Sequence, residues 1–330
     1  MKPSSGHVHV GLLNNHTKPQ MAKIWFTMCN NLNLEMLFRD SISSLLRYIQ
    51  LFMILIIPNN KLVTQVSLPC VRLHFDKFSE LDFYSSVSHE EYTDGVEIVK
   101  QWYKPWIDLS KFKYAYFMGD GITKAIDITR LEYSNLSWSM LDGDYDWLNG
   151  FGKIKKVTSV EELTDQINYI TQPFAGNGIL WSQEQLQSIS NKIIMDMAYI
   201  STTAPCIIEI PSQTERVFVG ASKSLGVGFL RHGWIFSKRV IPPLELLINN
   251  VKYFSSFNFR AGIHLYKNVD PVHQSEQGLK LQQEIVLNNP ILEKSDSWLI
   301  TYSKQTLNPV LKRGDVYRVP LGLTINSMNL

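Results

Sequence analysis

The sequence is poor in the residues that mark metal and disulfide proteins. Its only cysteines, Cys29, Cys70 and Cys206, are widely spaced and match no metal-binding pattern. So few cysteines fit a reducing compartment. A small histidine group near the start of the chain lacks a suitably spaced carboxylate or cysteine, so we expect no metal site. These histidines are His7, His9 and His16.

Long apolar runs and an excess of one charge are also missing. The apolar run 48–58 is too short to cross a bilayer and lies too far into the chain for a signal peptide. The net charge is only +2 and no basic tract stands out, which gives no electrostatic reason to expect nucleic-acid binding. We therefore expect a cytoplasmic globular protein without a membrane or nucleic-acid partner. Its 330 residues suffice for a large and a small domain.

The most informative stretch is 219–234, which reads VGASKSLGVGFLRHGW. Segments on both sides of it are rich in β-formers, so Lys223 is predicted where a strand runs into a glycine-rich loop, a usual place for chemistry. A lysine there, with hydroxyl and guanidinium donors nearby, suits a Schiff base to an aldehyde cofactor that carries a phosphate. The plainer alternative is a surface lysine in a flexible loop.

Two upstream segments are compatible with this interpretation. The segment 113–119 predicts a buried strand, followed by a glycine turn and Thr123 at a helix start, where free N–H groups and the helix dipole attract anions. The segment 192–201 predicts a buried strand that carries Asp196. A buried carboxylate is costly unless it meets a cation or a strong donor, and a protonated pyridine nitrogen is such a partner.

The lysine stretch resembles the motif of fold-type I pyridoxal-phosphate (PLP) enzymes, aminotransferase class I/II-like. Ser222 and Lys223 stand in the Ser-x-Ser/Ala-Lys pattern, with Gly226, Arg231 and Gly233 at the family's spacings. The resemblance covers roughly residues 80–325. It implies PLP as cofactor, bound covalently by Lys223, with Arg231 on its phosphate.

The resemblance also assigns roles to residues upstream. It implies a phosphate turn, an aromatic stacked on the ring, an aspartate on the ring nitrogen and a tyrosine on the phenolic oxygen. Trp147 is the second candidate for the aromatic. The matching residues are Gly121, Ile122 and Thr123 for the turn, Tyr145 for the stack, Asp196 for the nitrogen and Tyr199 for the oxygen.

Two positions depart from the family pattern. Gly220 stands where a phosphate-binding serine is usual. Ala175 stands where an asparagine usually binds the phenolic oxygen, so Asn177 is expected to replace it only if the loop is reshaped. In the family a C-terminal strand supplies an arginine for the substrate carboxylate, and Arg318 is the match, ahead of Arg260 and Arg313.

The predicted fold is α/β, with a PLP-transferase-like large domain and a smaller α+β domain. The large domain is an α/β/α sandwich around a mixed, mostly parallel sheet of about seven strands. We expect an arm that also contributes to the small domain and to dimer contacts over residues 1–80, the PLP-binding domain over 81–255 and the C-terminal small domain over 256–330. The resemblance implies a homodimer with sites at its interface, where Tyr84 or Tyr92 could reach the neighbouring subunit's phosphate.

The resemblance implies catalysis on an amino acid. Lys223, freed by the substrate amine, takes the α-proton, while Asp196 sustains the electron sink. Aminotransfer between an amino acid and a 2-oxo acid is the leading expectation. Decarboxylation, elimination, cyclisation and racemisation use the same parts, and a silent PLP-fold scaffold is the alternative from another class.

Local patterns predict further elements. We expect a helix over about 34–57, extended chain over 62–75, and a helix over about 94–103 that Pro105 ends. Serines three residues before a glutamate or glutamine predict capping boxes at Ser159 and Ser182.

Overall fold

The computed structural model describes residues 66–82, 84–152 and 154–322. The helix expected over 34–57, the histidine group and Cys29 lie outside these ranges. Nothing in the described ranges is a helix long and apolar enough to cross a membrane.

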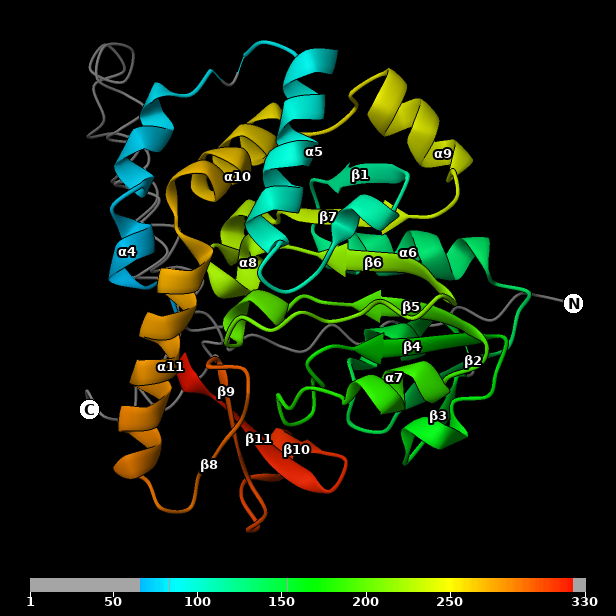
Figure 1. The fold of residues 1–330 in the computed structure, drawn as a ribbon, viewed down its shortest axis with the longest axis vertical. Helices are drawn as coiled ribbons and strands as arrows, with labels where there is room; N and C mark the ends of the chain where they lie inside the picture. The colour runs from blue at the N-terminus through cyan, green and yellow to red at the C-terminus, as the bar shows by residue number, and fades with distance from the viewer. Residues whose placement is uncertain (1–65, 83, 153, 323–330) are drawn as a thin grey trace, which may run out of the picture. The chain divides into compact units, whose positions relative to one another are not determined.

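A seven-stranded sheet forms the centre of the fold, with strand order β1-β7-β6-β5-β4-β2-β3 (Figure 1). All neighbouring pairs are parallel except those of β7, which runs antiparallel to both β1 and β6. The mixed, mostly parallel sheet is therefore confirmed. Its strands are β1 Tyr114–Met118, β2 Trp138–Leu141, β3 Lys155–Val157, β4 Ile167–Thr171, β5 Lys192–Asp196, β6 Thr214–Val219 and β7 Gly233–Ser237.

Three inner strands of this sheet are buried along their whole length. Every residue of β4, β6 and β7 is buried, as expected for strands with helices on both faces. On one face Phe117 and Trp234 contact the ring of Phe259 from α10. On the other face the guanidinium of Arg216 donates to the Thr129 hydroxyl of α6. The α/β/α sandwich is confirmed by these contacts.

The helices lie before, between and after the strands in the chain. Those of the first half are α4 Pro69–Arg72, α5 His89–Tyr103, α6 Ile122–Glu132 and α7 Gln183–Ser188. Those of the second half are α8 Ala221–Ser224, α9 Pro242–Leu244, continued by a π-helical turn Glu245–Asn250, α10 Ser256–Asn268 and α11 Pro271–Leu287. Single 3-10 turns are η1 Phe75–Glu80, η2 Leu109–Lys111, η3 Asp146–Phe151, η4 Val160–Glu162, η5 Ile200–Thr202, η6 Gly228–Leu230 and η8 Pro309–Leu311.

A second, four-stranded sheet follows α11, in the order β10-β11-β9-β8 (Figure 1). All its pairs are antiparallel. Its strands are β8 Glu293–Lys294, β9 Ile300–Ser303, β10 Lys312–Arg313 and β11 Val316–Pro320. β11 is the C-terminal strand predicted to carry Arg318.

The domain limits at residues 80 and 255 stay a prediction. α10 begins just after the second of them, yet it packs on α5 and on the aromatic side chains of the large sheet. Tyr92 of α5 stacks on Phe259 with ring centroids 5.7 Å apart. The contacts of α10 thus lie with the large sheet.

Several local expectations differ from the structure. Pro69 starts α4, so the described part of the segment expected to be extended contains a helical turn instead. α5 begins before the expected residue 94 because the Ser88 hydroxyl accepts from the Glu91 N–H and caps an earlier turn. The Ser182 capping box forms, whereas at Ser159 the Glu162 carboxylate accepts from the Thr158 N–H and no box closes.

Candidate functional site

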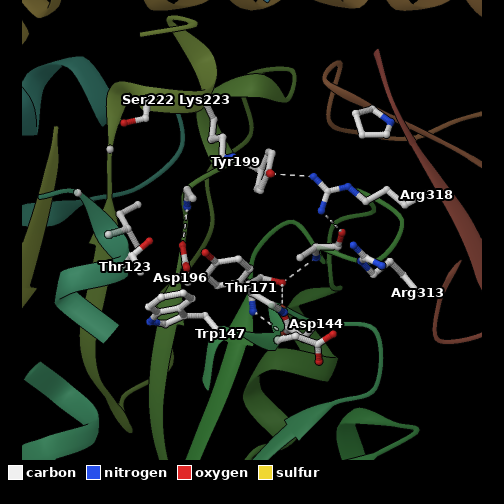
Figure 2. A pocket seen from close by; sticks show the side chains of 18 of the residues that line it. Thr123, Asp144, Trp147, Thr171, Asp196, Tyr199, Ser222, Lys223, Arg313 and Arg318 are labelled. Atoms are coloured by element: carbon white, nitrogen blue, oxygen red, sulfur yellow. Dashed lines mark hydrogen bonds between the residues drawn. The ribbon is translucent and has the colours of Figure 1, made fainter. Parts of the chain in front are cut away.

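A cavity of about 370 Å³ lies at the carboxyl ends of the parallel strands. Loops after β1, β2, β4, β5 and β6 line it, together with the second sheet. Figure 2 shows side chains from these separate elements converging on it. The carboxyl edge of an open α/β sheet is the usual ligand position, because strand ends and helix starts meet there. Every predicted site residue except Asn177 lines this cavity.

The first end of the cavity is the start of α6. Gly121, with φ 79°, turns the chain so that α6 begins at Ile122. The Arg231 guanidinium donates to the Asp120 carbonyl at 3.1 Å and to the Thr123 hydroxyl at 3.5 Å. Free N–H groups, a hydroxyl and a guanidinium therefore meet at one helix start, which suits a phosphate. We call these residues, Gly121, Ile122, Thr123 and Arg231, the anion end.

Gly220 at this end has a steric explanation. A Cβ added there would lie 2.7 Å from the His232 carbonyl oxygen and 3.2 Å from Ile122 Cδ1. Ile122 and the tight packing of Gly233 against the α6 start leave no room for the family's serine. Ser222 remains, with its hydroxyl 3.5 Å from the His232 carbonyl oxygen.

Lys223, Tyr199 and Arg318 meet near the other end of the cavity (Figure 2). The Lys223 ammonium lies 5.5 Å from the centre of the Tyr199 ring. Arg318 donates to the Tyr199 hydroxyl at 2.7 Å and to the Ala175 carbonyl at 3.0 Å. Its Nε is buried and has no partner among the described residues. We call Arg318, Tyr199 and Ala175 the arginine end.

These two cations act on the tyrosine. Burial by itself raises the pKa of Tyr199, but Arg318 and Lys223 outweigh it and lower the pKa to about 8. Tyr199 was expected on the same strand as Asp196, yet β5 ends at Asp196 and Tyr199 lies in the loop before η5. Tyr199 still lines the cavity, and its hydroxyl accepts from Arg318 there.

Asp196 lies on the floor of the cavity at the end of β5. It is buried, with one oxygen accepting from the Tyr169 hydroxyl at 2.7 Å and the other from the Ala198 N–H at 2.9 Å. Burial raises the pKa of Asp196, while Tyr169, the Ala198 N–H and Lys223 oppose that rise. The buried carboxyl predicted for this strand thus has one protein donor on each oxygen.

Both aromatic candidates line the cavity. Tyr145 and Trp147 are partly exposed, by 41% and 48%, and no aromatic partner covers either ring among the described residues. The Trp147 indole N–H donates to the Asp127 carboxylate at 2.7 Å, which fixes that ring against α6. Exposed rings at a cavity wall suit stacking on a planar ligand.

Asn177 lies outside the cavity. Its side-chain oxygen accepts from the Ile179 N–H at 3.0 Å, inside its own turn, and the residue does not line the cavity. The loop puts Ala175 at the cavity instead, as the family count gave. Its backbone N–H donates to the Thr171 hydroxyl and its carbonyl accepts from Arg318. Asn177 is therefore not directed at a ligand in this cavity, and its role at the phenolic oxygen stays a prediction.

The weaker candidates separate clearly. Arg260 pairs with Glu91 through two contacts of 2.6 and 2.8 Å, away from the cavity. Arg313 lines the cavity, with its guanidinium donating to backbone carbonyls. Tyr92 is buried, with its hydroxyl donating to the Ala115 carbonyl, which leaves Tyr84, 91% exposed, as the tyrosine free to meet another molecule.

Three residues of the site were missed. Asp144 is buried and accepts from the Thr171 hydroxyl at 2.6 Å and from the Tyr145 N–H at 2.8 Å. Burial raises its pKa to about 7, against the hydrogen bonds from Thr171 and Tyr145. Tyr169 and Thr171 alternate along β4, so hydroxyls two positions apart at a strand end were the available signal.

Comparison with known proteins rests on structure. Searches of family models and of curated proteins find no match. Histidinol-phosphate aminotransferase from Sinorhizobium meliloti, solved with pyridoxal-5'-phosphate, is similar with a TM-score of 0.59 and 15% identity, covering 79% of this chain and 88% of its own. Aspartate aminotransferase from Rhizobium meliloti gives 0.54 and 11%, covering 72% and 71%.

A lyase is similar as well. The PLP-bound C-S lyase from Staphylococcus hominis, complexed with the inhibitor L-cycloserine, gives a TM-score of 0.50 and 13% identity over 73% of this chain and 70% of its own. Identities this low establish architecture and not reaction. The chain therefore has the fold of the fold-type I, aminotransferase class I/II-like PLP enzymes.

Proposed function

We propose that this protein is a PLP-dependent enzyme that acts on an amino acid, with aminotransfer to a 2-oxo acid as its reaction. One observation carries the proposal. A lysine, a buried aspartate and two arginines from four separate elements converge on one cavity: Lys223, Asp196, Arg231 and Arg318. Charged residues that only stabilise the fold are not expected to converge on one cavity in this combination.

The donor set fits the cofactor. The anion end offers the start of α6 and the Arg231 guanidinium to a phosphate, and the exposed rings of Tyr145 and Trp147 offer a stacking surface. Asp196 offers a buried carboxylate to a pyridine nitrogen. Ser222 adds a hydroxyl to the cavity wall. The neighbouring Lys223 would bind the aldehyde carbon of the cofactor. When bound, PLP withdraws electrons from the substrate's α-carbon.

The protein's own groups then have distinct roles. Lys223 Nζ takes the proton from the α-carbon and returns it to the product side. Asp196 keeps a negative charge on the cavity floor, which stabilises a protonated pyridine nitrogen. The Tyr199 hydroxyl would donate to the phenolic oxygen of the cofactor. Arg318 holds the α-carboxylate of the substrate through two N–H groups, so the bond to be broken keeps a fixed direction.

The fold supports elimination as the second candidate, because a C-S lyase shares it. A silent scaffold is the candidate from another class, and the missing serine and asparagine at Gly220 and Ala175 speak for it. We also propose the predicted homodimer and the three-part domain division. An amine-donor screen separates the candidates: a spectral change without product favours the scaffold, while pyruvate and ammonia from a β-substituted amino acid favour the lyase.

The direct test is absorbance of the purified protein, then borohydride reduction and peptide mapping. We expect a yellow protein and a pyridoxyl label on Lys223. A Lys223→Ala variant should lose the label and at least about 10³-fold of its activity, because it lacks both the covalent anchor and the base. The control is Lys238→Ala, which changes a lysine that directly follows β7 and does not line the cavity, and it should keep both the label and the activity. A label on another lysine would contradict the assignment.

A further inference from the structure

Tyr169 is a buried hydroxyl that the mechanism above does not use. It lies on β4, is fully buried, and does not line the cavity. In the parallel pairing of β4 with β5, Thr171 is the partner of Asp196, and Tyr169 is two positions before it on the same face. Its ring therefore lies below the cavity floor and reaches Asp196 from beneath.

The contact is direct and isolated from water. The Tyr169 hydroxyl donates to Asp196 Oδ2 at 2.7 Å, while the Ala198 N–H occupies Oδ1. Each carboxylate oxygen thus has one protein donor and retains a lone pair for a ligand in the cavity. A hydrogen bond to a buried charged group is among the stronger ones in proteins.

The other groups around Asp196 explain why this donor matters. Asp144, in the loop after β2, lies near enough for the charge of Asp196 to raise the Asp144 pKa, and the β6 partner Phe218 is apolar and buried. Lys223 on α8 attracts the charge, and Tyr199 lies between Lys223 and Arg318. If Lys223 is bound to a cofactor, its ammonium charge is no longer fully available, so Tyr169 becomes the principal fixed donor besides Ala198.

We propose that Tyr169 is a positioning residue that fixes one oxygen of Asp196 and keeps this carboxyl ionised on the cavity floor. The inference rests on the proposed function for its catalytic meaning. The contact itself is a property of the chain alone, so it can be tested without any cofactor.

The test is the titration of Asp196 in the cofactor-free chain, followed by isotope-edited infrared spectroscopy of its carboxyl and assigned with Asp196→Asn. In Tyr169→Phe we expect the midpoint to rise by about one to two pH units, the shift for losing one hydrogen bond to a charged group. The sign follows because the Tyr169 hydroxyl makes a stronger hydrogen bond to the ionised carboxylate than to the protonated acid. The matched control is Tyr116→Phe, which removes a buried hydroxyl from Glu245 at 3.0 Å, away from the cavity.

A second variant guards against failure to fold. 3-Fluorotyrosine placed at position 169 keeps the shape but is a stronger donor, so the midpoint should fall. An unchanged midpoint in the Phe or fluorotyrosine variant, or an equal shift in Tyr116→Phe, overturns the proposal.

The pH dependence of α-proton exchange with a deuterated amino acid provides the second readout. Its acidic limb should move upward in Tyr169→Phe, with exchange restored at higher pH. If wild-type protein binds no PLP while the infrared midpoint still moves, the proposed function fails and the role of Tyr169 stands.

Discussion

The two ends of the cavity are built differently. At the anion end, backbone groups do most of the holding, since Gly121 starts α6 and Gly233 packs against it with no space for a Cβ. At the arginine end, side chains and one loop carbonyl form the site, because Arg318 from the second sheet donates to the Tyr199 hydroxyl and to the Ala175 carbonyl. We infer that the phosphate of the proposed cofactor meets a rigid site. The α-carboxylate of the proposed amino-acid substrate meets a site that depends on contact between two sheets.

Between the ends lies the floor, and Asp196→Asn should produce the largest effect there. The amide cannot hold a pyridine nitrogen protonated, so turnover should fall by about 10²- to 10³-fold, comparable to the loss of one preorganised electrostatic group. Binding of PLP should change little, because the anion end is untouched. Stopped-flow measurement of α-proton exchange with a deuterated amino acid tests this.

The control for the floor is Asp142→Asn, an exposed carboxylate two residues before Asp144. It should leave turnover unchanged. Turnover of Asp196→Asn equal to wild type would mean that Asp196 only supports the fold.

Arg318→Lys should break the arginine end alone. A lysine cannot donate to Tyr199 and a carboxylate in the same fork geometry, so KM for an amino acid should rise by about 10- to 100-fold, the range for a lost charge-assisted hydrogen bond. The Tyr199 pKa should move up only slightly from about 8, since lysine keeps the positive charge that lowers it and only the Arg318 hydrogen bond is lost. Steady-state kinetics and ultraviolet titration of tyrosinate measure the two effects.

Arg313→Lys is the matched control for this end. Arg313 also lines the cavity but donates only to backbone carbonyls among the described residues, so its KM effect should be much smaller. If Arg318→Lys loses PLP instead of substrate, the arginine belongs to the phosphate site. An amine without a carboxylate should react equally well with both variants.

The difference between the ends also decided what could be predicted from the sequence. The anion end and Lys223 follow from residues close together in the chain, because turns, helix starts and fixed spacings are local. The contact between Asp144 and Thr171 spans 27 residues and joins two strands whose register no local pattern reveals. The orientation of Asn177 could not be predicted for a related reason, since its side-chain oxygen accepts from the Ile179 N–H inside its own turn.

Gly220→Ser sharpens the comparison at the anion end. Restoring the family's serine should destabilise the protein by about 1–3 kcal/mol, because the new Cβ overlaps the His232 carbonyl and crowds Ile122. Ile122→Ala combined with Gly220→Ser should recover part of that loss, since only the Ile122 contact is relieved. Urea unfolding measures both, and PLP affinity should not improve. A tighter PLP complex in the single variant would show that this end is less rigid than its packing implies.

Asp144 tests the support of the arginine end, with the smallest expected effect. It holds Thr171, which holds the Ala175 N–H, and the Ala175 carbonyl holds Arg318. Its folded pKa is about 7 against an ordinary 3.8, so the folded protein binds this proton more tightly than the unfolded chain does. Stability from Asp144 is therefore complete below pH about 4 and is lost as pH rises to about 7.

Asp144→Asn should flatten that fall in the free energy of unfolding, whereas the exposed Asp142→Asn should not. The Asn oxygen can still accept from the Thr171 hydroxyl, but the amide nitrogen cannot accept from the Thr171 backbone N–H. About one hydrogen bond, worth ~1 kcal/mol, is therefore lost at low pH. Because Arg318 feels this change only through two intervening groups, KM should rise just a few-fold. Urea unfolding across pH 4–8 decides the question: a slope equal to wild type would place the titrating carboxyl elsewhere and leave the arginine end held by Tyr199 alone.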